Sequence, residues 1–171
     1  MGYGDKTLAK NPIYAKAHME RNQRNVQRSY NHASVTFWSL GNEAGFGPNF
    51  IACFDWIRQE DKMRPVQYEQ DYKAEYSDVY CPMYQDYRGN ENYLKNNPRV
   101  PLIQCEYAHA VGNSMGGFKE YWDLVRKYPS YQGGFIWDFV DQSVRWKNKD
   151  GIEIYGYGGD FNSYDGSDQN F

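Results

Sequence analysis

The sequence lacks the long apolar run and the paired cysteines that mark membrane-spanning, disulfide-rich and zinc-binding proteins. No segment approaches the roughly 18 apolar residues of a membrane span, and the first residues, MGYGDKTLAKN, hold no apolar signal-peptide core. The cysteines Cys53, Cys81 and Cys105 are odd in number, far apart and without a CxxC spacing. We therefore expect reduced, buried thiols. Such thiols suit the cytoplasm, and they equally suit part of a longer exported precursor bound for the periplasm or the cell exterior.

Strong charge of either sign is also lacking. The formal net charge of −3 over 171 residues argues against the basic face that nucleic-acid binding needs. Hydrophobic residues make up 40% of the chain, enough for one folded domain or for a piece of something larger. Aromatic residues are plentiful instead, at 17 Tyr, 9 Phe and 5 Trp. Such rings fill a core, and they also suit a site that stacks against flat ligand faces.

Apolar runs and amphipathic stretches alternate along the chain. The patterns predict strands over 35–40, 65–68, 78–81, 101–105 and 133–139, and helices over 13–30, 49–61, 90–97 and 116–127. The third of these strands should stop at Pro82. The first helix should be an outer helix with one buried face, formed by a thin apolar stripe of Ile13, Ala17, Met19, Val26 and Tyr30. The tail over 147–171 is rich in turn residues and suits a hairpin around Asp150 and Gly151. Strands that alternate with helices predict an α/β fold in which helical crossovers join parallel strands. We expect a single domain over 1–171.

Residues able to do chemistry gather just after the predicted strands. In chain order they are Glu43, Glu69 with Asp71, Met83 with Tyr84, Glu106 with His109, and Asp138 with Asp141. Reactive side chains at the carboxyl ends of successive parallel strands are typical of the active face of a TIM (β/α)8 barrel. A doubly wound sheet would hold its ligand at one switch point, and the GNEAGFG run lacks the GxGxxG phosphate spacing.

The number of strands limits this fold. A (β/α)8 barrel takes about 250 residues and eight strands, whereas the patterns here predict five strands. We therefore expect a partial barrel, about strands 4 to 8 with their helices. It would form the C-terminal portion of a catalytic barrel.

Glu43 and Glu106 would face one cavity if each ends a strand of the same barrel. Two carboxylates can divide proton donation and nucleophilic attack between them when their surroundings separate their pKa values. In glycoside hydrolysis, the distance between such carboxyl groups decides whether configuration is retained or inverted. A single Glu after a strand is more often a solvated loop residue, so the pair alone leaves both interpretations open.

Four segments carry a resemblance to a known family: SVTFWSLGNEAGFG, YCPMY, PLIQCEYAHAVGNSMGGF and QGGFIWDFVDQS. They resemble the catalytic barrel of the β-galactosidases of glycoside hydrolase family 2, over nearly the whole chain. The resemblance implies a retaining hydrolase that cleaves terminal β-galactosides by double displacement. Glu43 matches the general acid/base of that family, and Glu106 matches its nucleophile.

The same resemblance implies further substrate-binding residues. Asn42 matches a residue that binds the sugar 2-hydroxyl, and Tyr84, with Met83 beside it, matches a tyrosine that contacts the nucleophile. His109 matches a histidine that stabilises the transition state, and Trp137 matches the aromatic platform beneath the galactose. Without the motifs, core packing would be the plainer interpretation of Met83 and Trp137, and a backbone hydrogen bond that of His109.

Metal ions and partners also follow from the resemblance. Glu43 matches a ligand of an active-site magnesium ion, and the backbone carbonyl of Phe171 matches a ligand of a sodium ion. The family's other metal ligands lie outside this sequence, so we expect both sites to be incomplete in this chain. A partial barrel leaves sheet edges open, and we expect it to need the rest of the barrel or to self-associate.

Two alternatives stay open beside this interpretation. The isolated chain could be catalytically silent and act only as a sugar-binding or complementation segment. It could also be a structural α/β piece with no ligand, although the presence of both carboxylates and the aromatic platform argues against that. The expected ligand is a β-galactoside, and we expect no nucleic-acid partner and no membrane.

Overall fold

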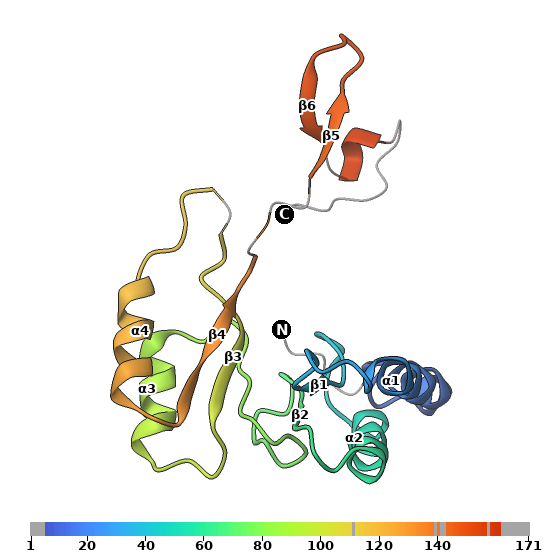
Figure 1. Ribbon diagram of the computed structural model, residues 1–171, viewed down its shortest axis with the longest axis vertical. Coiled ribbons are helices and arrows are strands. Elements are labelled where there is room, and N and C mark those ends of the chain that lie inside the picture. Colours follow the sequence, from blue (N-terminus) through green and yellow to red (C-terminus); the bar gives the residue numbers. More distant parts are fainter. Residues whose placement is uncertain (1–5, 111, 139, 141–142, 157, 162–171) are drawn as a thin grey trace.

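The computed structural model describes residues 6–110, 112–138, 140, 143–156 and 158–161 (Figure 1). Its helices are α1 (Ala15–Ser29), α2 (Pro48–Glu60), α3 (Tyr87–Lys95) and α4 (Phe118–Lys127), with short 3-10 turns over Pro12–Tyr14 and Gly158–Phe161. Its strands are β1 (Trp38–Ser39), β2 (Val66–Gln67), β3 (Leu102–Tyr107), β4 (Tyr131–Ile136), β5 (Val144–Lys147) and β6 (Glu153–Gly156). Within these described ranges, no helix is long and apolar enough to cross a bilayer.

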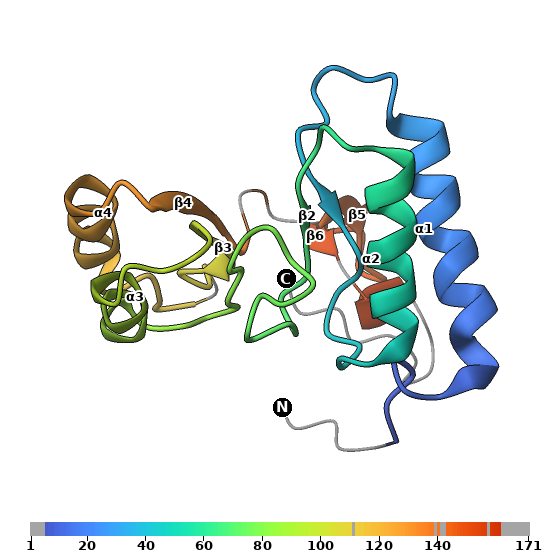
Figure 2. The ribbon, with the colours of Figure 1, turned by 90° about the horizontal axis from the view of Figure 1, so that it is seen from below.

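The strands β1 to β4 pair in parallel, as the alternating pattern predicts. β1 pairs with β2, with Trp38 opposite Val66, and β3 pairs with β4, with Leu102 opposite Tyr131. The helices lie outside the strands: α1 and α2 flank β1 and β2, and α3 and α4 flank β3 and β4 (Figure 1, Figure 2). Parallel neighbours with helices on their outer side form part of a barrel wall, whereas a doubly wound sheet carries helices on both faces.

The strand predicted over 78–81 forms only in part. Tyr80 pairs with Leu102 and Met83 with Glu106 as two isolated parallel bridges. Pro82 lies between the two bridges, and a proline has no N–H to donate to a ladder. The start of the segment also donates a backbone hydrogen bond of 2.8 Å to β2. The segment 78–84 therefore lies between β2 and β3 and joins the two halves of the wall.

Side chains alternate between the two faces of this wall. The outward set packs with the helices into a first core of Ala9, Val26, Trp38, Leu40, Phe50, Cys53, Ile57, Val66 and Tyr68. A second core holds Leu94, Leu102, Leu124 and Tyr131. The inward set lines an open hollow of about 460 Å³, which includes Phe37, Ser39, Gln67, Cys81, Ile103, Cys105 and Phe135. Phe135 is 68% exposed on this inner face, which shows how open the hollow is.

The three thiols agree with the expectation from the sequence. All are free, with Cys53 and Cys81 buried and Cys105 half-buried. Burial raises the pKa of Cys53 to about 11, against the smaller opposing effect of a hydrogen bond with Asn22. A thiol with such a pKa stays protonated at neutral pH, so Cys53 is a packing residue.

The apolar stripe predicted for the first helix is only partly buried. Val26 is fully buried, but Ile13 is 81% exposed because it lies in the 3-10 turn before α1. Tyr30 follows the last residue of α1 and is 49% exposed. Asn22 is buried instead, and its side chain donates to the Leu40 carbonyl oxygen at 3.2 Å.

Other boundaries differ by a few residues from the predicted ones. α3 begins at Tyr87, before the predicted residue 90, because the Asp86 side chain caps it by accepting from the Gly89 N–H at 2.7 Å. β4 begins at residue 131 instead of 133, and β3 runs on to residue 107. The antiparallel pairing of β5 with β6 confirms the hairpin predicted around Asp150 and Gly151.

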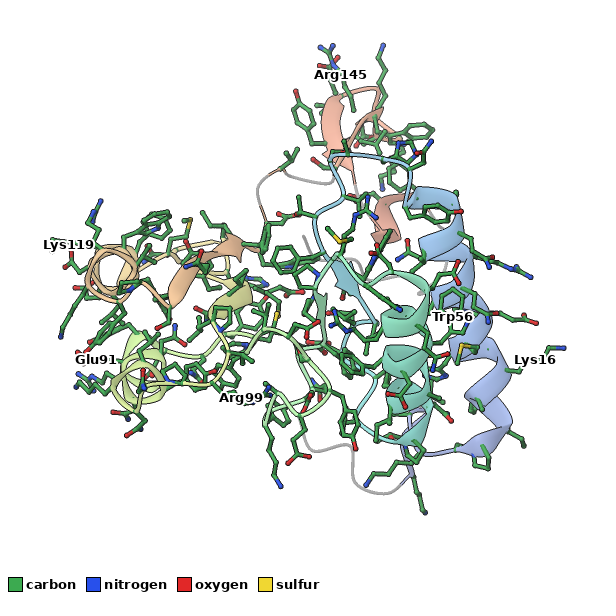
Figure 3. All side chains as sticks on the ribbon, turned by 60° about the horizontal axis from the view of Figure 1, so that its bottom comes forward. Lys16, Trp56, Glu91, Arg99, Lys119 and Arg145 are labelled. Carbon is green, nitrogen blue, oxygen red and sulfur yellow. The ribbon has the colours of Figure 1, made fainter. Side chains whose placement is uncertain are left out.

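The helices carry charged side chains on their outer surfaces, among them Glu91 and Lys119 (Figure 3). Lys127 Nζ and Glu91 Oε1 lie 3.0 Å apart and connect α4 with α3, and Lys119 pairs with Asp123 within α4. Solvent screens such exposed pairs, so the fold relies mainly on its two cores.

Asp61 offers a test of how the first core is held. Its carboxylate accepts from Trp38 Nε1 at 3.0 Å, from Arg64 Nη1 at 2.8 Å and from the Met63 N–H at 2.9 Å. Burial alone would raise the pKa of Asp61, but the hydrogen bonds from Arg64, Met63 and Trp38 outweigh it and hold the pKa well below its usual range. A depressed pKa contributes stability that is present at neutral pH and is lost as pH falls.

We expect Asp61→Asn to lower the free energy of unfolding by about 1.5–3 kcal/mol at pH 7, because it weakens hydrogen bonds to a charged group. The difference from the parent chain should shrink below about pH 4, where the unfolded carboxylate protonates. Urea titrations at neutral and acidic pH would measure this, with Asp55→Asn on the exposed side of α2 as the matched control. An equal loss in both variants would contradict the role given to Asp61.

Candidate active site

The residues singled out from the sequence lie at the carboxyl ends of the parallel strands. Glu43 follows β1, Glu69 follows β2, Tyr84 ends the joining segment, and Trp137 follows β4. Glu106 differs slightly from the prediction, because β3 extends through it and makes it the penultimate residue of the strand. Since parallel strands end at the same edge of a sheet, these residues lie at one end of the wall, the end that carries the active site in a (β/α)8 barrel.

The structure brings Tyr84 and Glu106 into direct contact. The Tyr84 hydroxyl donates to Glu106 Oε2 at 2.7 Å, and the Tyr84 backbone N–H donates to the Glu106 carbonyl oxygen at 2.8 Å. Tyr84 has a left-handed backbone with φ of 51°, and Met83, beside it, pairs with Glu106. The phenol and the carboxylate are thus fixed to each other through both side chain and backbone.

Tyr84 is held in its neutral form. Burial raises the pKa of Tyr84, and the hydrogen bond to Glu106, the charge of Glu106 and the charge of Glu43 raise it further. Its pKa therefore lies above its usual range, and the hydroxyl stays a hydrogen-bond donor at neutral pH. The charges of both candidate carboxylates act on this one phenol.

His109 and Trp137 lie on loops next to this pair. The rings of Tyr84 and His109 have centroids 5.6 Å apart, and His109 is exposed. The backbone N–H of Trp137 donates to the Tyr107 carbonyl oxygen at 3.1 Å, and the backbone carbonyl of Trp137 accepts from the Ala110 N–H at 2.7 Å. These bonds connect the loop after β4 with the loop that carries His109.

Glu43 is positioned by contacts that the sequence did not reveal. Its backbone has φ of 46°, and its N–H donates to Glu69 Oε1 at 2.6 Å. Asn42 precedes it and is exposed. Glu69 and Asp71, which the sequence places just after the second strand, are each only 4% exposed. Asp71 accepts from the Tyr76 N–H at 2.6 Å and closes its own loop, so its role is structural.

The described residues do not by themselves form a metal site. In the part of the chain that the structure describes, no group of three or more His, Cys, Asp or Glu side chains is placed to hold an ion. The Oε1 atom of Glu69 already accepts the hydrogen bond of the Glu43 backbone N–H. Phe171, the expected sodium ligand, lies outside the described residues. Magnesium and sodium therefore stay predictions, and no step of the proposed reaction is assigned to them.

Comparison with known proteins decides the family. A family model described as glycosyl hydrolases family 2, TIM barrel domain, matches residues 3–171. The chain belongs to this family. The resemblance drawn from the four motifs and the partial barrel predicted from the strand pattern are both confirmed.

The family 2 chain is similar to curated β-galactosidases along most of its length. It is 47% identical to the β-galactosidase of Leuconostoc mesenteroides over 92% of this chain, and 45% identical to that of Oenococcus oeni over 90%. It spans 16% of the length of each. The family model shows the family, and the roles of the individual site residues stay predictions.

Solved structures show the same fold at lower identity. A Ruminococcus gnavus β-glucuronidase aligns with a TM-score of 0.62 at 19% identity, over 82% of this chain and 32% of that one. A family 2 β-galacturonidase from Eisenbergiella tayi, solved with galacturonate, aligns with a TM-score of 0.60 at 17% identity, over 76% of this chain and 30% of that one.

Proposed function

We propose that this chain carries the two catalytic carboxylates of a retaining β-galactosidase. The hydrogen bond from the Tyr84 hydroxyl to Glu106 Oε2, at 2.7 Å, is the observation that supports the proposal most directly. It orients one carboxylate at the active face and leaves its other oxygen, Oε1, available to attack. The identity to curated β-galactosidases supports galactose as the sugar.

In the first step, Glu106 Oε1 bonds to the anomeric carbon of the galactoside while the bond to the leaving oxygen breaks. Glu43 donates its proton to that oxygen, so the leaving group departs as a neutral alcohol. The product is a covalent galactosyl ester of Glu106. Tyr84 keeps the carboxyl group in line throughout, because its hydroxyl remains protonated.

In the second step, the Glu43 carboxylate takes a proton from water, and the water oxygen bonds to the anomeric carbon. The ester bond breaks and Glu106 recovers its negative charge, which the Tyr84 hydroxyl stabilises as it forms. Two inversions give net retention. Asn42, Met83, His109 and Trp137 would bind the sugar, with the indole of Trp137 against its apolar face.

The inner face of the wall supports a requirement for the rest of the barrel. Phe135 and Phe37 on this face are 68% and 39% exposed. Gln67 Oε1, also on this face, is enclosed and has no hydrogen-bond partner among the described residues. An apolar face with an unpaired acceptor needs a cover. The chain alone would then either self-associate or stay catalytically silent. In the second case it would act as a complementation segment for the rest of the barrel.

The test is hydrolysis of a panel of aryl β-glycosides, comprising the galactoside, glucoside, mannoside and glucuronide. It should be run on the chain alone and on a chimera in which this chain replaces the matching segment of the Leuconostoc mesenteroides relative. Preferential turnover of the galactoside by the chimera would support the proposal, and preference for another sugar would refute the galactose assignment. Sedimentation of the chain alone as a monodisperse monomer would contradict self-association.

The role of Tyr84 can be measured in the same chimera. We expect Tyr84→Phe to lower kcat/KM by about 10- to 100-fold, the equivalent of one hydrogen bond to a charged group. Because the pKa of Tyr84 is raised, its ionisation should cause no fall in rate below about pH 10. Tyr72→Phe, at a tyrosine that is 62% exposed, is the control. Equal rates for the two variants would contradict the role of Tyr84.

A further inference from the structure

We propose that Glu69 is a positioning residue for Glu43, the candidate acid/base; the inference rests on the proposed function. Glu69 Oε1 accepts the hydrogen bond of the Glu43 backbone N–H at 2.6 Å. The Glu69 side chain is buried, with 4% of its surface exposed. The contact holds the backbone of Glu43, and so it leaves the Glu43 carboxyl group free to exchange a proton with substrate.

Tyr68, the neighbour of Glu69, holds the next two residues of the same loop. Its hydroxyl accepts from the Ala44 N–H at 3.2 Å and donates to the Gly45 carbonyl oxygen at 2.7 Å. Tyr68 is fully buried, and its ring stacks on Phe50 of α2 with centroids 4.1 Å apart. Two adjacent side chains at the end of β2 therefore hold three successive residues after β1.

The loop needs such support because of its backbone. Glu43 has φ of 46°, in the left-handed region that a residue with a side chain seldom adopts unless its surroundings enforce it, and Gly45, with φ of 76°, follows in the same region without that strain. In this conformation the N–H groups of Glu43 and Ala44 bond to side chains of the next strand. Glu69 and Tyr68 thus satisfy donors that would otherwise lose their partners away from water.

A carboxylate suits this task better than a neutral side chain. Burial raises the pKa of the Glu69 carboxyl, and the hydrogen bond from the Glu43 N–H opposes that rise because it favours the charged form. A charged acceptor makes a shorter and stronger hydrogen bond to an N–H group than an amide oxygen does. Misplacing a catalytic group by about 1 Å can cost on the order of 100-fold in rate. Glu69 therefore contributes to proton transfer by fixing the position from which Glu43 acts. A glutamine at this position should provide only part of that effect.

The test exploits the fact that a good leaving group needs little help from an acid. In the chimera, kcat/KM would be measured for aryl β-galactosides whose phenols range from unsubstituted phenol to 2,4-dinitrophenol. We expect Glu69→Ala to lower kcat/KM about 100-fold for the phenyl galactoside and only severalfold for the dinitrophenyl one. Glu69→Gln should restore part of the loss.

Asp71→Ala is the matched control, because Asp71 is equally buried but bonds the Tyr76 N–H instead of the site. It should affect all leaving groups alike. A uniform loss across the series in Glu69→Ala would overturn the positioning role while leaving the proposed function intact. Full turnover by a Glu106→Gln chimera would instead refute the proposed function.

A second measurement needs no turnover. In the 171-residue chain, hydrogen exchange at the Glu43 amide should be slow, and it should accelerate at least tenfold in Glu69→Ala. The amides of the second core should be unchanged, which would show that the variant still folds. Unchanged protection of the Glu43 amide in Glu69→Ala would overturn the proposal, whatever the activity of the chimera.

Discussion

Replacing Glu106 with glutamine should abolish hydrolysis of β-galactosides by the chimera. We expect kcat/KM to fall roughly 10⁴-fold or more, the scale on which other hydrolases lose rate when their nucleophile is removed. An amide oxygen is too weak a nucleophile to form the galactosyl ester. The Tyr84 hydroxyl can still donate to that oxygen, so Glu106→Gln should keep the local structure and lose the chemistry.

Two measurements make this prediction specific to Glu106. Glu120→Gln, at an exposed glutamate of α4, should leave the rate unchanged. A 2-deoxy-2-fluoro galactoside with an activated leaving group should label the parent chimera covalently, because the fluorine slows both steps and the activated leaving group offsets this only in the first, so the galactosyl ester accumulates. Mass spectrometry should find the label on the peptide that contains Glu106. A label on Glu43 or Glu69 would contradict the assignment.

Replacing Asn90 with alanine should cause the largest loss of stability. Asn90 is fully buried in α3, where its side chain donates to Gln104 Oε1 at 3.0 Å and to the Tyr131 hydroxyl at 3.1 Å. It also accepts from Gln85 Nε2 at 2.9 Å. The substitution leaves these buried partners unpaired, and each unpaired group costs about 1–3 kcal/mol. We expect the free energy of unfolding to fall by about 3–5 kcal/mol.

Urea titration of the chain measures this loss. Asn92→Ala is the matched control, because Asn92 lies on the exposed side of the same helix and should change stability by no more than about 0.5 kcal/mol. A loss in Asn90→Ala as small as in the control would show that the buried network contributes little. The network also reaches the site, since Gln104 Nε2 and the Tyr121 hydroxyl donate to the Gln85 carbonyl at 2.6 and 3.0 Å. Gln85 directly follows Tyr84.

The sequence predicts the fold well where the signal is local. Alternating strands and helices predicted the parallel order, and the Asp150–Gly151 turn predicted the β5–β6 hairpin. The strand over 78–81 was predicted to stop at Pro82, whereas the segment pairs on both sides of Pro82 and forms only isolated bridges, because an apolar run does not show how many ladder bonds a segment makes. Ile13 and Tyr30 were assigned to a buried stripe because helical spacing says nothing of where the helix begins and ends.

Some residues of the site can likewise be predicted from the sequence, and others cannot. Motif resemblance predicts the roles of Glu43, Tyr84 and Glu106, because each of them stands within a long motif that resembles the family's. The sequence places Glu69 after a strand but shows neither its partner nor its burial, and it gives no sign of the role of Asn90. Each of the two bonds to partners far along the chain, and a polar residue in a loop or helix suggests exposure. Only the three-dimensional structure shows that Glu69 accepts a backbone N–H across a gap of 26 residues.

The two separate cores imply that heating disrupts different parts of this chain at different temperatures. Glu43 belongs to the half built on the first core, and Glu106 to the half built on the second. The interrupted segment 78–84 joins the halves and carries Tyr84. Regions with few ladder bonds open at lower free energy than packed cores. Warming should therefore loosen this joint and misalign the two carboxylates before either core melts, so that a chimera carrying this chain would lose activity before it unfolds.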